Sequence, residues 1–230
     1  MRQVASPLED GWRHRLLASG IVAACFVALA GCGGGPFGAK KAMLWNGKDF
    51  AGWKLYIPDD TVNTADVWSV KDGVIYCKGK PNGYMRTKHR FSNYRLHVEW
   101  RWPEVPANSG VLLHASGPDK VWPKCIECQL KSGSAGDMVL MNGTGVTVNG
   151  HVMQDPRKQF VVIPKMEKST EYAPGQWNTY EIYCLKDTIR CYVNGTLQNE
   201  AEKATVTSGW ICLQSEGGPI EFRNIFIEPL

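Results

Sequence analysis

The sequence lacks the long apolar runs and the concentrated charge that mark membrane-embedded and nucleic-acid-binding proteins. After residue 31 no apolar stretch approaches the roughly 20 residues that a membrane-spanning helix needs. No run of Lys or Arg exceeds the pair Lys40-Lys41, and the formal net charge is only +4, from 26 basic and 22 acidic residues. We therefore expect no nucleic-acid partner.

Several catalytic motifs are also missing. The chain has no GxSxG elbow, no phosphate-binding loop, no HExxH and no dinucleotide fingerprint. Serine esterase, nucleotide-dependent and zincin chemistry therefore lose their usual support, and we expect neither a nucleotide nor an organic cofactor. Helical periodicity is missing as well, because no segment of ten or more residues repeats apolar positions at helical spacing. The predicted fold class is all-β.

The amino terminus has the charge and hydrophobicity order of a secretory signal peptide. Arg13, His14 and Arg15 precede the uncharged apolar residues 16–30. The sequence LAGC that ends at Cys32 resembles a lipobox, in which the cysteine is acylated; the alternative is an ordinary cleavage site with an incidental cysteine. We predict a signal peptide over 1–31, an acylated Cys32 with a Gly-rich tether over 32–41, and lipid anchoring in a bacterial cell envelope, in the periplasm or at the outer membrane.

Residues 42–230 have the length of one β-sandwich domain, and no linker divides them. Short strand signals recur with turns between them. A hairpin is predicted over 67–77, turned by Lys71-Asp72-Gly73, and the other strands are predicted over 94–102, 110–114, 124–131, 180–186, 189–193, 210–214 and 221–228. Nine Trp and eight Tyr help to fill the core between two sheets. Residues 139–168 are interpreted as long loops with short strands.

Six cysteines follow Cys32. If Asp187-Thr188 is a two-residue turn, Cys184 and Cys191 face each other across a hairpin, where a disulfide or two packed thiols would fit. Cys125 and Cys128 have CxxC spacing, but no second CxxC or paired histidines complete a zinc site, so we interpret them as structural.

Polar residues alternate with apolar ones on several predicted strands. Glu127 and Gln129 share a face opposite Ile126 and Cys128, because successive side chains of a strand point to opposite faces. By the same rule the preceding strand offers His114, an earlier strand offers Arg101, and a later segment offers Gln214 and Glu216. These polar rows could line one concave sheet; the alternative is that each is simply the solvated face of its strand.

Trp122 and Lys124 lie in and after the loop between the strands of His114 and Glu127. An indole beside carboxylate, amide and imidazole groups suits sugars, because apolar sugar faces stack on indole while hydroxyls need planar hydrogen-bond partners. The alternative for Trp122 is a rim aromatic held by Pro123.

Motifs along nearly the whole of 44–230 resemble the 3-keto-disaccharide hydrolase family of bacterial lipoproteins. The matching stretches are LWNGKDFAGW at 44–53, WSVKDG at 68–73, LHVEWR at 96–101, NSGV at 108–111, IECQL at 126–130, PGQWN at 174–178, VNG at 193–195 and IEFRNI at 220–225. The resemblance implies a concanavalin A-like jelly-roll sandwich. It also implies action on glycosides already oxidised at C3 by a partner oxidoreductase.

A ketone at C3 acidifies the C2 proton, so the C1 bond can break by elimination and water can then add to the enone. Our hypothesis makes His114 or Glu127 the C2 base and Arg101 or Lys124 the enolate stabiliser. Trp122, Gln129, Gln214 and Glu216 are predicted to bind the sugar. A divalent metal held by Glu127 and His114 is an alternative stabiliser.

Two other functions fit the same sequence. A non-catalytic, lectin-like lipoprotein would bind unoxidised oligosaccharides without turnover. A structural adaptor would use residues 139–168 as a partner surface. The membrane enters each interpretation only through the lipid anchor at Cys32.

Overall fold

The computed structural model describes residues 40–230, and the predicted signal peptide and Cys32 lie outside that range. The predicted all-β class and jelly-roll sandwich are confirmed, since the described residues form two large antiparallel sheets, with a small two-stranded sheet and one short 3-10 helix, η1 (Thr64–Asp66). Within 40–230 there is no helix of the length and apolarity that crossing a bilayer requires.

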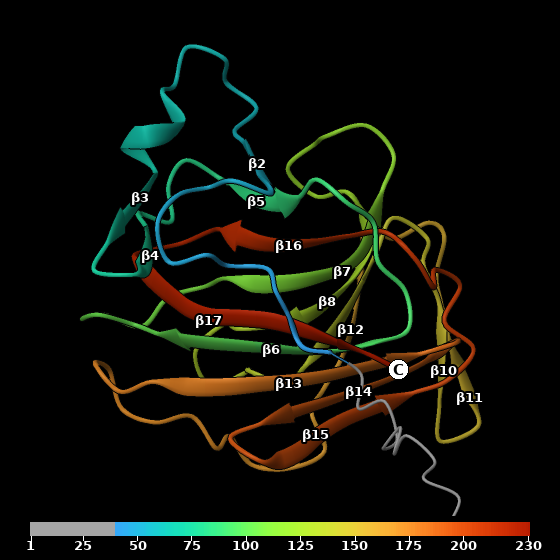
Figure 1. The fold of residues 1–230 in the computed structure, drawn as a ribbon. Helices are drawn as coiled ribbons and strands as arrows, with labels where there is room; N and C mark the ends of the chain where they lie inside the picture. Colours follow the sequence, from blue (N-terminus) through green and yellow to red (C-terminus); the bar gives the residue numbers. More distant parts are fainter. Residues whose placement is uncertain (1–39) are drawn as a thin grey trace, which may run out of the picture. The chain divides into compact units, whose positions relative to one another are not determined.

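One sheet has eight strands (Figure 1). Its strands, in spatial order, are β15 (Thr196–Ala201), β14 (Thr188–Val193), β13 (Asn178–Leu185), β6 (Tyr94–Arg101), β17 (Ile220–Pro229), β4 (Val74–Cys77) and β3 (Trp68–Lys71), with β1 (Ala42–Met43) paired to β17. The predicted hairpin is β3 and β4, and its turn residues Asp72 and Gly73 both have positive φ, as a tight two-residue hairpin turn requires.

The other large sheet has seven strands. Its spatial order is β12 (Phe160–Ile163), β9 (Met138–Met141), β8 (Lys124–Gln129), β7 (Gly110–Ser116), β16 (Trp210–Ser215), β5 (Gly83–Thr87) and β2 (Trp53–Tyr56). A separate hairpin pairs β10 (Val146–Val148) with β11 (His151–Met153). Residues 139–168 thus contain the short strands that were expected, and two of them, β9 and β12, extend the seven-stranded sheet.

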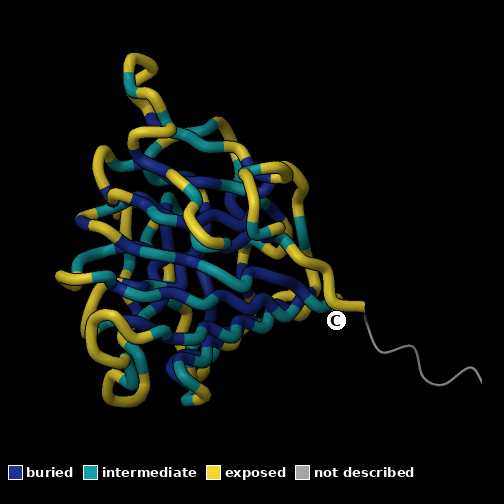
Figure 2. The backbone as a smooth tube through the Cα atoms, turned by 60° about the vertical axis from the view of Figure 1, so that its left-hand side comes forward, coloured by how far each residue is buried: buried dark blue, intermediate teal, exposed yellow. Residues whose placement is uncertain are grey.

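The main core fills the space between the two sheets. Alternate residues of each strand point inward, including Val98 and Trp100 on β6, and Ile126 and Cys128 on β8. Buried backbone runs through the middle of both layers and exposed backbone lies in the turns (Figure 2). The large apolar side chains, expelled from water by the hydrophobic effect, hold the sheets face to face.

The predicted pairing of Cys184 with Cys191 is wrong by one register step. The turn between β13 and β14 is Lys186-Asp187, so Cys184 lies opposite Ile189. Cys191 instead reaches across the core, where its Sγ lies 2.8 Å from Sγ of Cys128 on the other sheet. Both Cys125 and Cys128 are buried free thiols, in agreement with their structural interpretation.

Candidate functional site

The outer face of the seven-stranded sheet carries a second apolar cluster, separate from the main core. Its buried members are Tyr84, Leu112, Ala115, Cys125, Val139, Met141 and Cys212, and the partly buried Tyr56, Trp122 and Trp210 pack against them. A sheet face covered in this way is shielded from water, so ionisable groups within it experience a low dielectric.

Glu127 lies in the middle of this covered face. Alternation along β8 turns its side chain away from the core that receives Ile126 and Cys128, and the register places Leu112 and Val139 on either side of it. Glu127 is 3% exposed, and no donor among residues 40–230 hydrogen-bonds to its carboxyl group. Burial raises the pKa of Glu127 well above its ordinary value, and the nearby charge of Glu216 raises it further. The neutral acid is therefore the favoured form of Glu127 in the folded protein.

Gly110 provides the space that the Glu127 carboxyl group occupies. A methyl group at position 110 would overlap Glu127 Oε1 and would lie 2.7 Å from Oε1 of Gln214 on β16. Glu127 and Gln214 therefore converge above the same glycine from the two strands that flank β7. Gln214 is 2% exposed and its Oε1 has no hydrogen-bond partner within the described residues.

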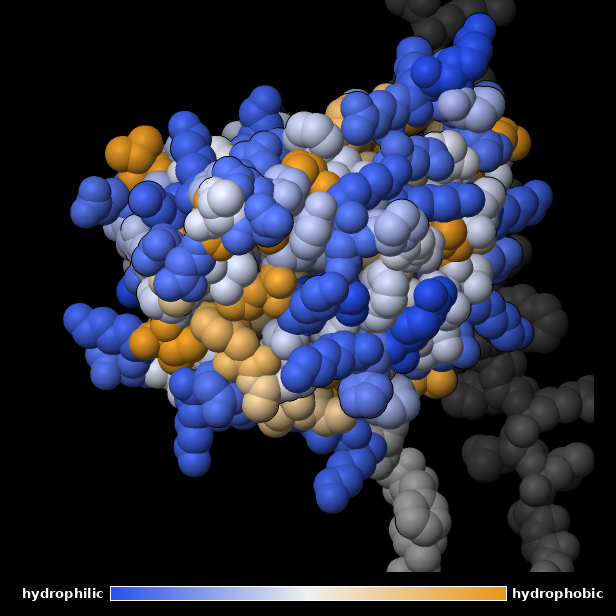
Figure 3. All heavy atoms as spheres, turned by 90° about the horizontal axis from the view of Figure 1, so that it is seen from above, coloured by the Kyte–Doolittle hydropathy of each residue, from blue (hydrophilic) through white to orange (hydrophobic). Residues whose placement is uncertain are grey.

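A cavity of about 250 Å³ opens above Glu127. Its lining contains four of the predicted site residues and five others: Asn108, Trp122, Glu127, Gln129, Val139, Met141, Phe160, Val162 and Glu216. The structure thus brings Trp122, Glu127, Gln129 and Glu216 together at one cavity. The face of the molecule seen in Figure 3 is largely hydrophilic, and a group of apolar residues lies within it.

Glu216 is the second carboxyl group of the cavity. It follows β16 and forms an isolated bridge with Asn108, which precedes β7. Burial raises the pKa of Glu216, while the Asn108 amide and the Trp122 indole act in the opposite direction as hydrogen-bond donors. Since Glu216 is only half-buried and has these donors, its charged form is better stabilised than that of Glu127.

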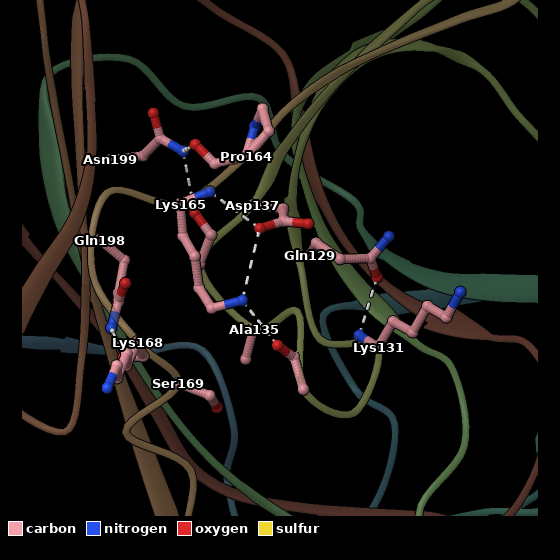
Figure 4. Close-up of polar contacts among 12 residues, drawn as sticks. Gln129, Lys131, Ala135, Asp137, Pro164, Lys165, Lys168, Ser169, Gln198 and Asn199 are labelled. Carbon is pink, nitrogen blue, oxygen red and sulfur yellow. Dashed lines mark hydrogen bonds and ion pairs between the residues drawn. The ribbon is translucent and has the colours of Figure 1, made fainter.

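Gln129 is held in one orientation by its own backbone. Its Oε1 accepts hydrogen bonds from the amides of Leu130 (3.0 Å) and Lys131 (2.9 Å), which leaves Nε2 as the group available to a ligand (Figure 4). The turn after β8 is fixed in turn by Lys165, whose Nζ donates to the carbonyl of Gly133 at 2.6 Å. These contacts hold the Gln129 side chain in one conformation, so its amide is a fixed donor at the cavity.

Trp122 is fixed from two sides. Asn142 Nδ2 donates to the carbonyls of Trp122 (2.9 Å) and Pro123 (3.1 Å), and the Trp122 ring meets Phe160 edge to face at 5.6 Å. This geometry is favourable for aromatic pairs. The indole is therefore preorganised at the cavity wall.

The loop that carries Trp122 is tied to the sheet through Asp119. That carboxylate accepts hydrogen bonds from Tyr84 Oη (2.8 Å), Arg86 Nε (2.8 Å) and Lys54 Nζ (2.6 Å). Burial would raise the pKa of Asp119, but these three donors outweigh it and hold the pKa well below its usual range. Asp119 therefore stays ionised and acts as a structural anchor.

His114 does not reach the cavity, contrary to the strand-alternation prediction. The register of β7 shifts between Leu113 and Ser116, and His114 has a φ of 55°. The bulge turns the imidazole toward the Tyr94 ring, 5.7 Å away, and its Nδ1 lies 3.1 Å from the carbonyl of Val206, to which it must donate. Burial lowers the pKa of His114 to about 4, so the imidazole is neutral.

Arg101 and Lys124 also lie away from Glu127. Arg101 is on the outer face of the eight-stranded sheet, where Nε donates to Glu221 Oε2 at 2.5 Å and the guanidinium lies 4.5 Å from the Trp177 ring centroid. Lys124 is exposed at the start of β8, opposite Ser116, and does not line the cavity. Neither cation is placed to stabilise an enolate formed at Glu127.

The divalent-metal alternative loses its proposed ligand pair, because Glu127 and His114 face different sides of their sheet. Within 40–230, no three side chains of His, Cys, Asp or Glu come together in a metal-binding arrangement. The polar side chains that line the cavity are two carboxyl groups, two amides and the Trp122 indole, and the Gln214 amide lies beside Glu127 beneath them.

The apolar wall of the cavity was not among the predicted site residues; it is formed by Val139 and Met141 on β9 and by Phe160 and Val162 on β12. The run FVVI at 160–163 consists of aromatic and β-branched residues, which favour strands, so a signal was present. Asn108 was identified only as part of the family stretch NSGV at 108–111.

The match to known families covers nearly the whole described domain. Residues 40–228 match the model of the 3-keto-alpha-glucoside-1,2-lyase-like domain. No protein of curated function matches the chain in sequence.

Solved structures share the fold. A putative glycosyl hydrolase from Parabacteroides distasonis is 23% identical, with a TM-score of 0.61 over 83% of this chain and 94% of that one. A beta-glucanase from Bacillus licheniformis is 14% identical, with a TM-score of 0.55 over 84% and 98% of the two chains. The carbohydrate-binding module CBM66 from Bacillus subtilis is 10% identical, with a TM-score of 0.54 over 77% and 95%.

Proposed function

Because the chain belongs to the family of 3-keto-alpha-glucoside-1,2-lyase-like domains, we propose that it cleaves glycosides that carry a ketone at C3. The observation that carries the proposal is the pair of carboxyl groups, Glu127 and Glu216, that face one cavity in unequal environments. Burial raises the pKa of both groups, but only Glu216 has donors that oppose this effect. Two carboxyl groups with unequal proton affinity can act as acid and base in one reaction.

The C3 ketone of such a substrate acidifies the proton at C2. A base removes this proton, the electron pair forms the C1=C2 double bond, and the aglycone leaves from C1 with a proton from an acid. Water then adds at C1 and a proton returns to C2, which releases a 3-keto sugar. No oxocarbenium ion is needed, so the carboxylate pair of ordinary glycosidases has different roles here.

We assign the acid to Glu127 and the base to Glu216. Glu127 holds its proton more strongly because it is buried between Leu112 and Val139, whereas donors from Asn108 and Trp122 partly offset the burial that raises the pKa of Glu216. The roles reverse during hydration. This replaces the initial hypothesis, in which Glu127 or His114 was the base.

The amides in and beside the cavity support binding of the oxidised sugar. Gln129 Nε2 is free to donate to the C3 ketone oxygen, where negative charge develops, because Gln129 Oε1 is already occupied. Gln214 and Asn108 each present a buried oxygen without a partner, which suits sugar hydroxyl donors. Trp122 offers an indole to the apolar face of the sugar ring.

We further propose that the domain is exported and anchored through Cys32, downstream of a sugar C3 oxidoreductase. The proposal is supported by the order of charges and apolar residues over 1–31 and by the LAGC sequence that ends at Cys32. Anchoring at the cell envelope would hold the domain where oligosaccharides enter.

Incubation of the purified protein with a 3-keto-disaccharide and with its unoxidised parent tests the function. We expect sugar release from the keto form alone. The enone formed by elimination should be seen as a transient absorbance before water adds to it. Binding of the parent without turnover of either compound would contradict the enzyme and favour the lectin-like alternative.

A further inference from the structure

The cavity above Glu127 has two chemically different halves. Over β7, β8 and β16 it is lined by carboxyl and amide groups, whereas over β9 and β12 it is lined only by Val139, Met141, Phe160 and Val162. Because the strand order is β12-β9-β8-β7-β16, the apolar half lies at the edge of the sheet and the polar half toward its middle. Glu127, on β8, stands at the boundary.

The outward side chains of β12 are unusual for an edge strand. Phe160 is 36% and Val162 54% exposed, while Ile163 turns into the core and is 5% exposed. Edge strands of natural proteins generally present polar or charged residues outward, because exposed apolar edges promote association. Here the exposed apolar residues border the cavity, and Phe160 also holds Trp122 edge to face.

The position of the glycosidic bond decides which half receives which part of a substrate. The hydroxyls and ketone of the oxidised sugar need hydrogen-bond partners, which only the polar half provides. The aglycone leaves beside Glu127 and so extends over Val139 and Val162. A second sugar in that place would lie with hydroxyl groups against side chains that cannot hydrogen-bond. Hydroxyl groups left without partners lower the binding free energy gained.

We infer that the site prefers 3-keto-glycosides with an apolar ring as aglycone over 3-keto-disaccharides. This inference rests on the proposed function. The size of the cavity agrees with it: at about 250 Å³ it lies just below the roughly 300 Å³ at which pockets enclose drug-sized ligands. It therefore holds one sugar ring, with the aglycone against the open apolar ledge of β12.

The test compares cyclohexyl 3-keto-glucoside with a 3-keto-glucosyl-glucose of the same anomeric configuration, on the full chain. Cyclohexanol is no better a leaving group than a sugar hydroxyl, so faster cleavage of the cyclohexyl compound reports binding. We expect its kcat/KM to be about tenfold higher than that of the disaccharide, the discrimination typical of apolar pockets.

Val162→Thr and Phe160→Ala test whether the side chains of β12 are responsible for the preference for the cyclohexyl substrate. Val162→Thr is expected to lower kcat/KM for the cyclohexyl substrate roughly tenfold and for the disaccharide less than twofold, whereas Phe160→Ala also removes the ring that packs on Trp122 and is expected to lower both values. Val152→Thr is the matched control, because Val152 is 75% exposed on β11 and outside the cavity. It should leave both values unchanged.

Calorimetric titration with the two unoxidised glycosides makes the same comparison without turnover. If neither keto substrate reacts but the cyclohexyl glucoside binds more tightly and Val162→Thr weakens it, the proposed function fails and the ligand preference stands. Equal cleavage of both substrates, or a preference unaffected by Val162→Thr, overturns the inference. A change of oligomeric state in Val162→Thr with both rates unaltered also overturns it, and assigns the β12 edge to a second copy of the chain.

Discussion

Glu127 gains its chemistry from its immediate neighbours. Leu112 and Val139 flank it in register, Gly110 leaves it room, and no donor within 40–230 hydrogen-bonds to its carboxyl group. Burial among apolar side chains without a donor thus favours the neutral carboxylic acid, which is one general route to a group that acts as an acid.

The division of roles between the two carboxyl groups predicts opposite dependence on the leaving group. Glu127→Gln removes the proton donor, so kcat/KM should fall about 100-fold or more for a sugar or alkyl aglycone but only slightly for a nitrophenyl aglycone, which needs no protonation. Glu216→Gln should abolish both reactions. Kinetics of the two variants on both 3-keto substrates provide the measurement. Equal losses for both aglycones in Glu127→Gln would exclude its role as the acid.

The raised pKa of Glu127 predicts a stability effect of defined sign. Above the unfolded pKa, the unfolded carboxyl group loses its proton while the folded one retains it, so the native state loses stability as pH rises toward the folded pKa. Glu127→Gln, which cannot ionise, should therefore have a higher Tm than the wild type at pH 8, with a difference that shrinks toward pH 4. A domain of this size shifts by about 2–4 °C for each kcal/mol. Thermal unfolding across this pH range measures the effect, and an unchanged Tm difference contradicts the assigned burial.

His114 predicts the opposite dependence. Its pKa is lowered to about 4 by burial, below the ordinary 6.5. As pH falls from 6.5 to 4 the unfolded imidazole binds a proton that the folded one does not, which costs the native state roughly 3 kcal/mol. His114→Gln should reduce this acid sensitivity and leave kcat/KM within about twofold, since His114 does not touch the cavity. A large loss of kcat/KM in the folded variant would restore His114 to the catalytic site.

At the scale of the strand, regular alternation was predictable and its interruptions were not. Glu127 and Gln129 follow from β8 because Ile126 and Cys128 specify the buried face. His114 does not follow from β7, because a bulge with a positive φ changes the direction of one side chain and leaves no periodic signal. The β13–β14 turn lies one residue earlier than predicted for a similar reason. Lys186 adopts positive φ, which sequence alone does not indicate for lysine.

The strand β7 also provides a test through Gly110. A methyl group there would overlap the Glu127 carboxyl group and crowd Gln214, so Gly110→Ala should destabilise the fold by about 1–3 kcal/mol. It should also lower kcat/KM by displacing Glu127. Chemical denaturation together with kinetics at a temperature where the variant is folded measures both. Unaltered stability would mean that the carboxyl group lies elsewhere.

At the scale of the whole molecule, the sandwich separates groups that sequence order brings close together. Arg101 and Glu127 lie on strands near one another in the chain, but those strands belong to different sheets and their polar faces point to opposite sides. The jelly-roll class could be predicted from strand periodicity and the family motifs. The assignment of each strand to a sheet could not, because it depends on long-range pairing such as β7 with β16.

The predicted anchor belongs to the same scale. Cys32→Ser should move the protein from the membrane fraction to the soluble fraction without changing kcat/KM, because Cys32 precedes the domain and acylation requires a thiol. Fractionation of cells that express each form, with mass spectrometry of the mature amino terminus, provides the measurement. An unmodified amino terminus at another residue contradicts anchoring while leaving export open.

The central claim is that Glu216 and Glu127 cleave 3-keto-glycosides through loss of the C2 proton. Cleavage in D2O tests it most directly, with the intact substrate and the released 3-keto sugar analysed by mass spectrometry and NMR, and with enzyme-free samples to subtract spontaneous exchange. The account predicts one deuterium at C2 of the sugar released by the wild type and neither label nor cleavage with Glu216→Gln. Cleavage by Glu216→Gln at the wild-type rate, with the original C2 proton retained in the released sugar, would contradict it.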